Sequence, residues 1–117
     1  MLTVPGQVKV FLCLGATDMR KSFDSLAAMV QEQLKLDPLS GHLFVFRSRR
    51  GDRLKLLYWE ETGYALWYKR LEVSSFRFPQ APADQKSLTI SAADLAMLLD
   101  GVDLTSVRRQ KRYRRSA

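Results

Sequence analysis

The chain has 117 residues, enough for a single domain with its own core, and one cysteine, so an intrachain disulfide is excluded. No apolar stretch approaches the roughly 20 residues of a membrane span, and the N-terminus lacks a signal-peptide pattern, so we expect no membrane contact and a reducing cytoplasm. The net charge of +7 is uneven: residues 107–117 hold six cations and no acid, which leaves +1 for residues 1–106.

The first part of the chain predicts a strand followed by a helix. Residues 8–14 alternate loosely between apolar and polar side chains, which is typical of a strand. Thr17, Asp18 or Ser22 could cap the helix that follows. Its apolar stripe, interrupted by Gln33, consists of Phe23, Leu26, Ala27, Val30 and Leu34. We expect the helix to end before Asp37, because the residue preceding a proline is biased away from helical angles.

Residues 42–70 predict a β-meander. Their three apolar runs, rich in Val, Tyr, Trp and Phe, are Leu43–Phe46, Leu54–Trp59 and Tyr64–Tyr68. Two short segments of turn-forming residues separate the runs. Gly51 and Gly63 are the natural residues for a positive φ at the end of each turn.

The length of the first turn decides which side chains share a face of the sheet. A three-residue loop, residues 49–51, would pair Arg47 with Arg53. One face would then carry Phe44, Phe46, Leu54, Leu56 and Tyr58, and the other Leu43, Val45, Arg47, Arg53, Lys55, Leu57 and Trp59. A two-residue loop would shift the parity and scatter the cations among the phenylalanines, so we favour the odd loop, which segregates charge. For the second turn, both parities stay open.

The C-terminal part predicts further strands and a second helix. We expect a strand around residues 75–78, before Pro79, and residues 87–90 could form another short one. Ser91 is expected to cap a helix that Gly101 ends. The apolar stripe of this helix is Leu95, Leu98 and Leu99.

These elements predict an α+β fold in the order β-α-β-β-β-β-α: a mostly antiparallel β-meander sheet with one covering helix and a short C-terminal helix. The first helix is expected to cover the face that carries Phe44, Phe46, Leu54 and Leu56. Residues 1–106 are expected to form a single domain. Residues 107–117 are expected to be a disordered basic tail, because almost no apolar side chain is there to be buried.

No motif supports catalysis, a metal or a cofactor. The twelve acids fall in caps, turns and helix faces, where local structure explains them, and no spacing favours a metal-dependent nuclease site. Cys13 and His42 cannot build a four-ligand zinc site by themselves; Cys13 is best read as a core residue and His42 as a strand-edge residue. No phosphate-binding glycine loop is present. The sequence therefore predicts a protein that is not an enzyme.

The cations favour nucleic acid. Arg20 and Lys21 stand near a helix N-terminus, where cations oppose the helix dipole. Either Arg20 pairs with Asp24 or Asp18, or the corner formed by residues 18–21 and the helix N-terminus binds phosphate. The residues predicted to bind nucleic acid are Arg20, Lys21, Arg47, Arg49, Arg50, Arg53, Lys55, Lys69 and Arg70 and, in the tail, Arg108, Arg109, Lys111, Arg112, Arg114 and Arg115.

Two other interpretations stay open. The cations could form an ordinary solvated face, with the tail aiding only solubility. Alternatively, the protein could be an adaptor that contacts another protein through an aromatic face around Trp59, Trp67 and Tyr68, with the charges at the rim. The sequence leaves the oligomeric state open.

Two ordered segments carry a resemblance to a known family. They are TDMRKSFDSLA (residues 17–27) and DPLSGHLFVFRSRRGDRLKLLYWEETGYALWYKRLE (residues 37–72). From about Val8 to Asp103, the chain resembles the accessory TnpB proteins of bacterial insertion sequences of family sixty-six, which differ from the RNA-guided nuclease of the same name. It departs from that pattern at Ser22, Ser25 and Phe78. The resemblance implies a small protein that is needed, together with a separate transposase, for efficient transposition. It supplies no mechanism, so transposon DNA is expected as a partner because of the cations.

Overall fold

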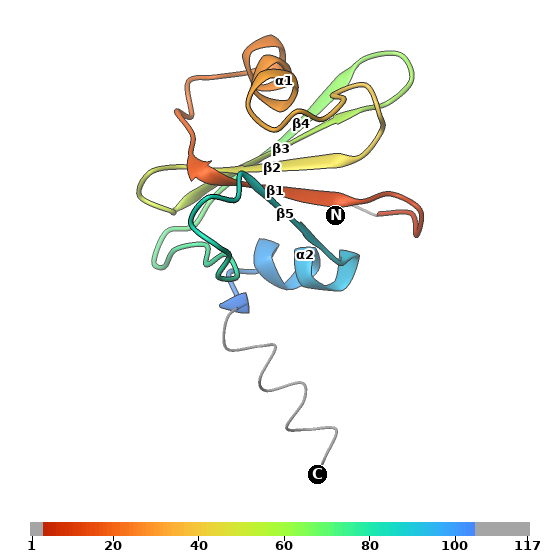
Figure 1. The fold of residues 1–117 in the computed structure, drawn as a ribbon. Coiled ribbons are helices and arrows are strands. Elements are labelled where there is room, and N and C mark those ends of the chain that lie inside the picture. Colours follow the sequence, from red (N-terminus) through yellow and green to blue (C-terminus); the bar gives the residue numbers. More distant parts are fainter. Residues whose placement is uncertain (1–3, 105–117) are drawn as a thin grey trace.

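A computed structural model describes residues 4–104 (Figure 1). Its elements are β1 (Val10–Ala16), α1 (Phe23–Glu32), β2 (Leu43–Arg47), β3 (Arg53–Trp59), β4 (Tyr64–Arg70), β5 (Ser87–Ile90) and α2 (Ala92–Leu99). The predicted α+β fold and the order β-α-β-β-β-β-α are confirmed. The predicted disordered tail, residues 107–117, lies outside the described residues.

The five strands form one sheet in the order β4-β3-β2-β1-β5. β1 and β2 are parallel, with α1 between them in the chain, and every other neighbouring pair is antiparallel. Because β1 and β2 run in the same direction, they finish at the same end of the sheet, and the residues that follow them meet there. There the Thr17 N–H donates to the Arg47 carbonyl oxygen at 2.9 Å.

Both faces of the sheet are covered, α1 lying on one and α2 on the other (Figure 1). The α1 side buries Cys13, Leu26, Ala27, Met29, Val30, Leu34, Phe44, Phe46 and Leu57. The α2 side buries Val10, Leu12, Val45, Leu54, Leu56, Leu95, Leu98 and Leu99, together with Phe76 and Phe78 of the segment after β4. Burial on both faces explains why the strands are nearly continuous apolar runs rather than alternating ones.

The predicted parity of the first hairpin is wrong. Val45 pairs with Leu56 and Arg47 with Leu54, so the loop has four residues, 49–52, and not three. The face that α1 covers therefore carries Lys55 beside the phenylalanines, whereas Leu54 and Leu56 point to the α2 side. Charge segregation did not decide the register, because burial on both faces left no separate polar face.

Three smaller expectations also differ from the structure. Gly51 has the predicted positive φ, but after β3 it is Glu61, and not Gly63, that adopts one. Residues 75–78 form no strand, although Phe76 and Phe78 are buried. Phe23 is 44% exposed rather than part of the core, because it lies in the first turn of α1 and the later turns supply the buried side chains.

Ser22, one of the three predicted caps, and Ser91 begin the two helices, but α1 ends at Glu32 and leaves Leu34 of the predicted stripe beyond the helix. Ser22 is the N-cap residue of α1, and its N–H donates to the Ser25 hydroxyl at 3.0 Å. Ser91 caps α2 by accepting a hydrogen bond from the Asp94 N–H at 3.0 Å. Gly101 follows α2 with a φ of +83°, a value that favours glycine.

Candidate nucleic-acid interface

The turn between β2 and β3 presents two arginines to solvent. The Gly51 N–H donates to the Ser48 carbonyl oxygen at 3.0 Å, and the Ser48 hydroxyl donates to the Asp52 carboxylate at 3.2 Å. These bonds close the turn without using an arginine side chain. Arg49 and Arg50 are exposed, and within residues 4–104 their side chains form no hydrogen bond or ion pair.

The turn is braced by the segment after β4. The Phe76 N–H donates to the Gly51 carbonyl oxygen at 2.6 Å. Gly51 is buried with a φ of +79°, and a Cβ atom there would lie 3.5 Å from the Ser75 Cβ. The bracing segment also brings the exposed Arg77 to the turn, a cation absent from the sequence-based prediction. The alternation Phe76-Arg77-Phe78 was the available signal, since it points Arg77 away from the core.

Arg47 lies beneath the turn and is half-buried. Its guanidinium carbon is 4.0 Å from the centroid of the Phe78 ring, and its Nη1 donates to the Phe76 carbonyl oxygen at 3.2 Å. Burial, and secondly the charge of Arg77, lower the pKa of the Arg47 guanidinium from its ordinary value. A hollow of about 190 Å³ is lined by Arg47 and Arg77 together with Arg49 and Arg50 of the turn.

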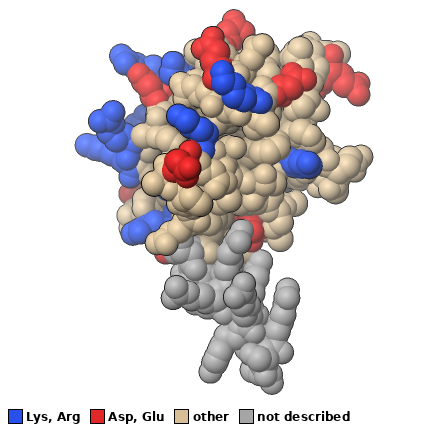
Figure 2. All heavy atoms as spheres, viewed as in Figure 1, with Lys and Arg blue, Asp and Glu red and all other residues tan. Residues whose placement is uncertain are grey.

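We call Arg47, Arg49, Arg50, Arg53 and Arg77 the arginine cluster. Figure 2 shows Lys and Arg side chains gathered at the margin of the molecule where Figure 1 places the β2–β3 turn, with acidic side chains nearby. The acid within the turn, Asp52, accepts a hydrogen bond from Ser48. The only ion pairs among residues 4–104 are Arg20–Asp18 and Arg70–Glu72. No arginine of the cluster is therefore ion-paired in the described part of the chain.

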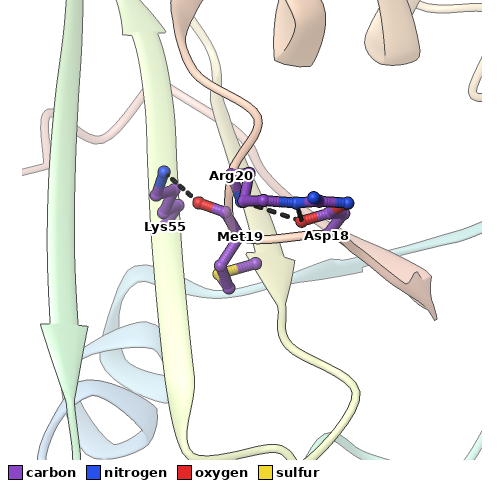
Figure 3. Close-up of polar contacts among 4 residues, drawn as sticks. All are labelled: Asp18, Met19, Arg20 and Lys55. Atoms are coloured by element: carbon purple, nitrogen blue, oxygen red, sulfur yellow. Dashed lines mark hydrogen bonds and ion pairs between the residues drawn. The ribbon is translucent and has the colours of Figure 1, made fainter.

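The corner before α1 faces the same turn. Arg20 wraps around Asp18: the carboxylate accepts hydrogen bonds from the Arg20 backbone N–H at 2.9 Å, Nε at 3.1 Å and Nη2 at 2.7 Å (Figure 3). The hydrogen bonds from Arg20 hold the pKa of the Asp18 carboxyl well below its usual range. Of the two ion pairs considered for Arg20, the structure shows the one with Asp18 and not the one with Asp24.

Lys55 fastens this corner to the sheet. Lys55 on β3 is only 7% exposed, and its Nζ donates to the Met19 carbonyl oxygen at 2.7 Å (Figure 3). The same Nζ donates to the Lys21 carbonyl oxygen, also at 2.7 Å. Nζ also lies 4.8 Å from the centroid of the Tyr68 ring. The sequence predicts Lys55 as a nucleic-acid contact. Because its amine is buried and already engaged, we leave it out of the candidate interface.

The corner and the turn together line a cleft of about 470 Å³. Residues 16–19 contribute one wall, and Arg49, Arg50 and Arg53 belong to the other. These walls are some 30 residues apart in sequence but meet because β1 and β2 are parallel neighbours. Cationic hollows thus flank the turn on two sides, one lined by Arg53 and the other by Arg47 and Arg77.

A match to a known family covers this cleft and most of the chain. The family described as "IS66 Orf2 like protein" matches residues 8–109. The chain belongs to the IS66 Orf2-like family. The family consists of accessory proteins of IS66 insertion sequences, so this protein has an accessory role associated with transposition. The resemblance seen in the sequence is confirmed.

Two relatives of this IS66 Orf2-like protein come from Sinorhizobium fredii (strain NBRC 101917 / NGR234). The first, "Uncharacterized protein y4hO", is 46% identical over 103 residues, which cover 88% of this chain and 88% of the relative. The second, "Uncharacterized protein y4jC", is 35% identical over 103 residues, covering 88% of this chain and 86% of the relative. No solved structure is significantly similar.

Two other cations predicted as contacts, Lys69 and Arg70, form bonds within the IS66 Orf2-like domain. Lys69 Nζ donates to the Leu99 carbonyl oxygen at 2.8 Å, on the α2 side. Arg70 pairs with Glu72 at 2.9 Å. Lys21 is partly exposed beside the corner. The predicted contacts in the tail, Arg108, Arg109, Lys111, Arg112, Arg114 and Arg115, lie outside the described residues.

The aromatic residues predicted as a protein contact do not share one face. Tyr68 lies on the α1 side of β4, where it is 49% exposed and its hydroxyl accepts from Arg53 Nη1 at 3.3 Å. Trp59 packs edge-on against Tyr64, with ring centroids 5.1 Å apart. Trp67 lies on the opposite side and packs against the core beneath α2. Strand alternation separates Trp67 from Tyr68, since neighbouring residues point to opposite faces.

Within residues 4–104, no three His, Cys, Asp or Glu side chains come close enough to hold a metal ion. Cys13 is buried, and that burial raises the pKa of its thiol. The His42 ring accepts a hydrogen bond at Nδ1 from the Lys9 N–H at 3.0 Å. No helix in the described part of the chain is long and apolar enough to cross a bilayer.

Proposed function

We propose that this protein is a non-enzymatic accessory factor that binds the DNA of its insertion sequence through the arginine cluster. The observation that carries the proposal is the concentration of arginines around Gly51 without ion pairs in the described part of the chain. Close cations repel one another, as the effect of Arg77 on Arg47 illustrates. A polyanion would relieve this repulsion.

The chemistry of the cluster suits phosphate. A guanidinium donates two parallel hydrogen bonds to phosphate oxygens, and its charge persists at any physiological pH. Arg49 and Arg50 are exposed and need break no internal bond to reach a ligand. The acids near them are occupied, Asp18 by Arg20 and Asp52 by Ser48, which lowers their competition with phosphate. The proposed contact is therefore to the sugar-phosphate backbone, which positions a protein without reading sequence.

The test is a salt titration of binding to terminal DNA of the insertion sequence. Arg49→Gln with Arg50→Gln should weaken binding at 100 mM salt and lower the log–log salt slope by roughly one to two, because each lost phosphate contact removes about 0.9. Lys9→Gln with Lys35→Gln is the matched control. It removes the same charge from two exposed cations that line neither hollow: Lys9 precedes β1 and Lys35 follows α1.

Both double variants should unfold within about 0.5 kcal/mol of the parent, since all four side chains are exposed. Equal slopes in parent, cluster variant and control would refute DNA binding by this cluster. A slope that falls equally in both variants would assign binding to overall charge and not to the turn.

A second candidate function is that of an adaptor that binds the separate transposase without touching DNA. The observation in its favour is Tyr68, a large aromatic side chain that is 49% exposed on the outermost strand β4. Capture of the transposase that survives high salt and is lost in Tyr68→Ala would support the adaptor, because an aromatic-centred contact depends little on ionic strength.

A further inference from the structure

Within residues 4–104, strand β4 is an edge of the sheet that no other strand pairs with. It is seven residues long, pairs with β3 in one continuous register and contains no proline. The Glu60 N–H donates to the Gly63 carbonyl oxygen at 2.9 Å, and the Leu71 N–H donates to the Asp52 carbonyl oxygen at 2.8 Å. Gly63 and Leu71, which flank β4, thus both bond toward β3, and both are odd-numbered. In an antiparallel ladder every second residue bonds to the same neighbouring strand, so the odd-numbered residues of β4 direct their backbone groups toward β3.

The even-numbered residues of β4 therefore turn their backbone groups outward. They are Tyr64, Leu66, Tyr68 and Arg70. Within residues 4–104, none of their outward N–H or C=O groups has a hydrogen-bond partner. A long regular edge with open backbone groups is a template for another strand, and proteins usually block such edges.

The other edge of the sheet is blocked in two ways. First, β5 has only four residues. Second, one of its outward groups is occupied: because the Leu14 N–H donates to the Lys86 carbonyl oxygen, the even-numbered residues of β5 bond to β1, and Ser87 and Thr89 face outward. The outward carbonyl oxygen of Ser87 accepts a hydrogen bond from Gln85 Nε2 at 2.7 Å. The protection that β5 has and β4 lacks marks β4 as the edge available for pairing.

We infer that β4 pairs with β4 of a second copy, antiparallel and centred on Trp67, to form a homodimer with a continuous ten-stranded sheet. In this register Tyr64 lies opposite the partner's Arg70 and Leu66 opposite the partner's Tyr68. All outward backbone groups of β4 then find partners, which no other antiparallel register achieves within the strand.

The side chains on β4 fit this register. Arg70 meets a tyrosine and Lys69 meets Ala65, so no two cations stand directly opposite, whereas an in-register parallel pair would oppose Arg70 to Arg70. The two Trp67 residues form a non-hydrogen-bonded pair, in which side chains approach most closely and aromatic pairs stabilise a sheet. A second copy is thus a self-complementary occupant of this edge.

The dimer does not depend on the proposed DNA function, but it has a consequence for it. The two β2–β3 turns lie at opposite ends of the joined strands, because each is next to Arg70 of its own β4. With about 3.4 Å per residue and 4.8 Å per strand, the two turns are roughly 35 Å apart. That spacing is close to one turn of B-form DNA, about 34–36 Å.

The experiment measures the mass of the full chain by sedimentation equilibrium over a wide concentration range at high salt. Tyr68→Pro removes an outward N–H but no bond to β3, while Tyr68→Ala removes the same side chain and keeps that N–H. We expect a concentration-dependent dimer in the parent. The dimer should be at least about tenfold weaker in Tyr68→Pro than in Tyr68→Ala, because both variants lose the tyrosine side chain and only proline also loses the outward N–H.

A cross-link tests the register. In a Cys13→Ala background, Trp67→Cys should form an intermolecular disulfide on oxidation, because a non-hydrogen-bonded pair places its Cα atoms about 4.5 Å apart. Ala65→Cys should not, since the two new cysteines would lie roughly 14 Å apart. Circular dichroism verifies that each variant is folded.

A parent that stays monomeric at several hundred micromolar would overturn the inference. So would a dimer that Tyr68→Pro leaves intact, or one that Tyr68→Ala abolishes equally, because the contact would then not be a strand pair. If the parent is monomeric and Tyr68→Pro but not Tyr68→Ala loses the transposase, the edge belongs to that partner and not to a second copy.

Discussion

Replacing Lys55 by methionine tests whether a single buried amine holds the corner before α1 in place. Methionine keeps most of the apolar stem but removes two hydrogen bonds, to the carbonyl oxygens of Met19 and Lys21, each 2.7 Å long. Bonds from a charged donor contribute about 1.5–3 kcal/mol each, or roughly 3–6 kcal/mol together. Removing a charge from a site that is 7% exposed restores part of this, because the desolvation penalty disappears.

We therefore expect Lys55→Met to lower the free energy of unfolding by about 2–3 kcal/mol. Urea denaturation of parent and variant at pH 7 measures this difference, and the midpoint should fall while the slope stays constant. Arg49→Met is the control. It removes an exposed cation without a hydrogen bond in the described chain and should change stability by less than about 0.5 kcal/mol. A change below about 0.5 kcal/mol for Lys55→Met would refute the reasoning, since water would then satisfy both carbonyl groups equally well.

The remaining predictions concern stability at single positions. Gly51→Ala should destabilise the protein by about 1–2 kcal/mol, because Gly51 has a positive φ. Gly63→Ala should cost under about 0.5 kcal/mol, because Gly63 has no positive φ and its new Cβ would have no neighbour within 4 Å; thermal unfolding of the two variants checks the difference. Leu26→Ala should cost about 2–5 kcal/mol, and Phe23→Ala less than about 1.5 kcal/mol, since Leu26 is fully buried and Phe23 is 44% exposed; a larger loss at Phe23 would contradict its placement. Arg20 lowers the pKa of the Asp18 carboxyl in the folded protein. The ionised carboxylate therefore stabilises the fold fully at pH values above its ordinary pKa of about 4, and this contribution is lost progressively as the pH falls below that value. Asp18→Asn should therefore lower the urea midpoint at pH 7, with a difference that shrinks below pH 4.

The local elements of this protein are determined by short stretches of its sequence. The apolar runs of residues 42–70, the helical spacing of Leu26, Ala27 and Val30, and the capping Ser91 act over a few residues, and the structure contains the elements they predict. The absence of a catalytic motif and the family resemblance are also properties of the sequence. The arginines of the β2–β3 turn belong with these, because a turn exposes its middle residues wherever the sheet lies.

The tertiary structure alone decided the roles of Lys55 and Arg77 and the edge of the sheet that stays open. The buried position of Lys55 depends on a register fixed by packing on both faces of the sheet, and its partners at residues 19 and 21 are distant in sequence. Arg77 joins the arginine cluster only because an irregular segment folds back beneath Gly51. The open edge of β4 follows from the strand order, which places β5 beside β1 and leaves β4 last. Contacts between distant segments depend on the whole fold, so no local pattern encodes them.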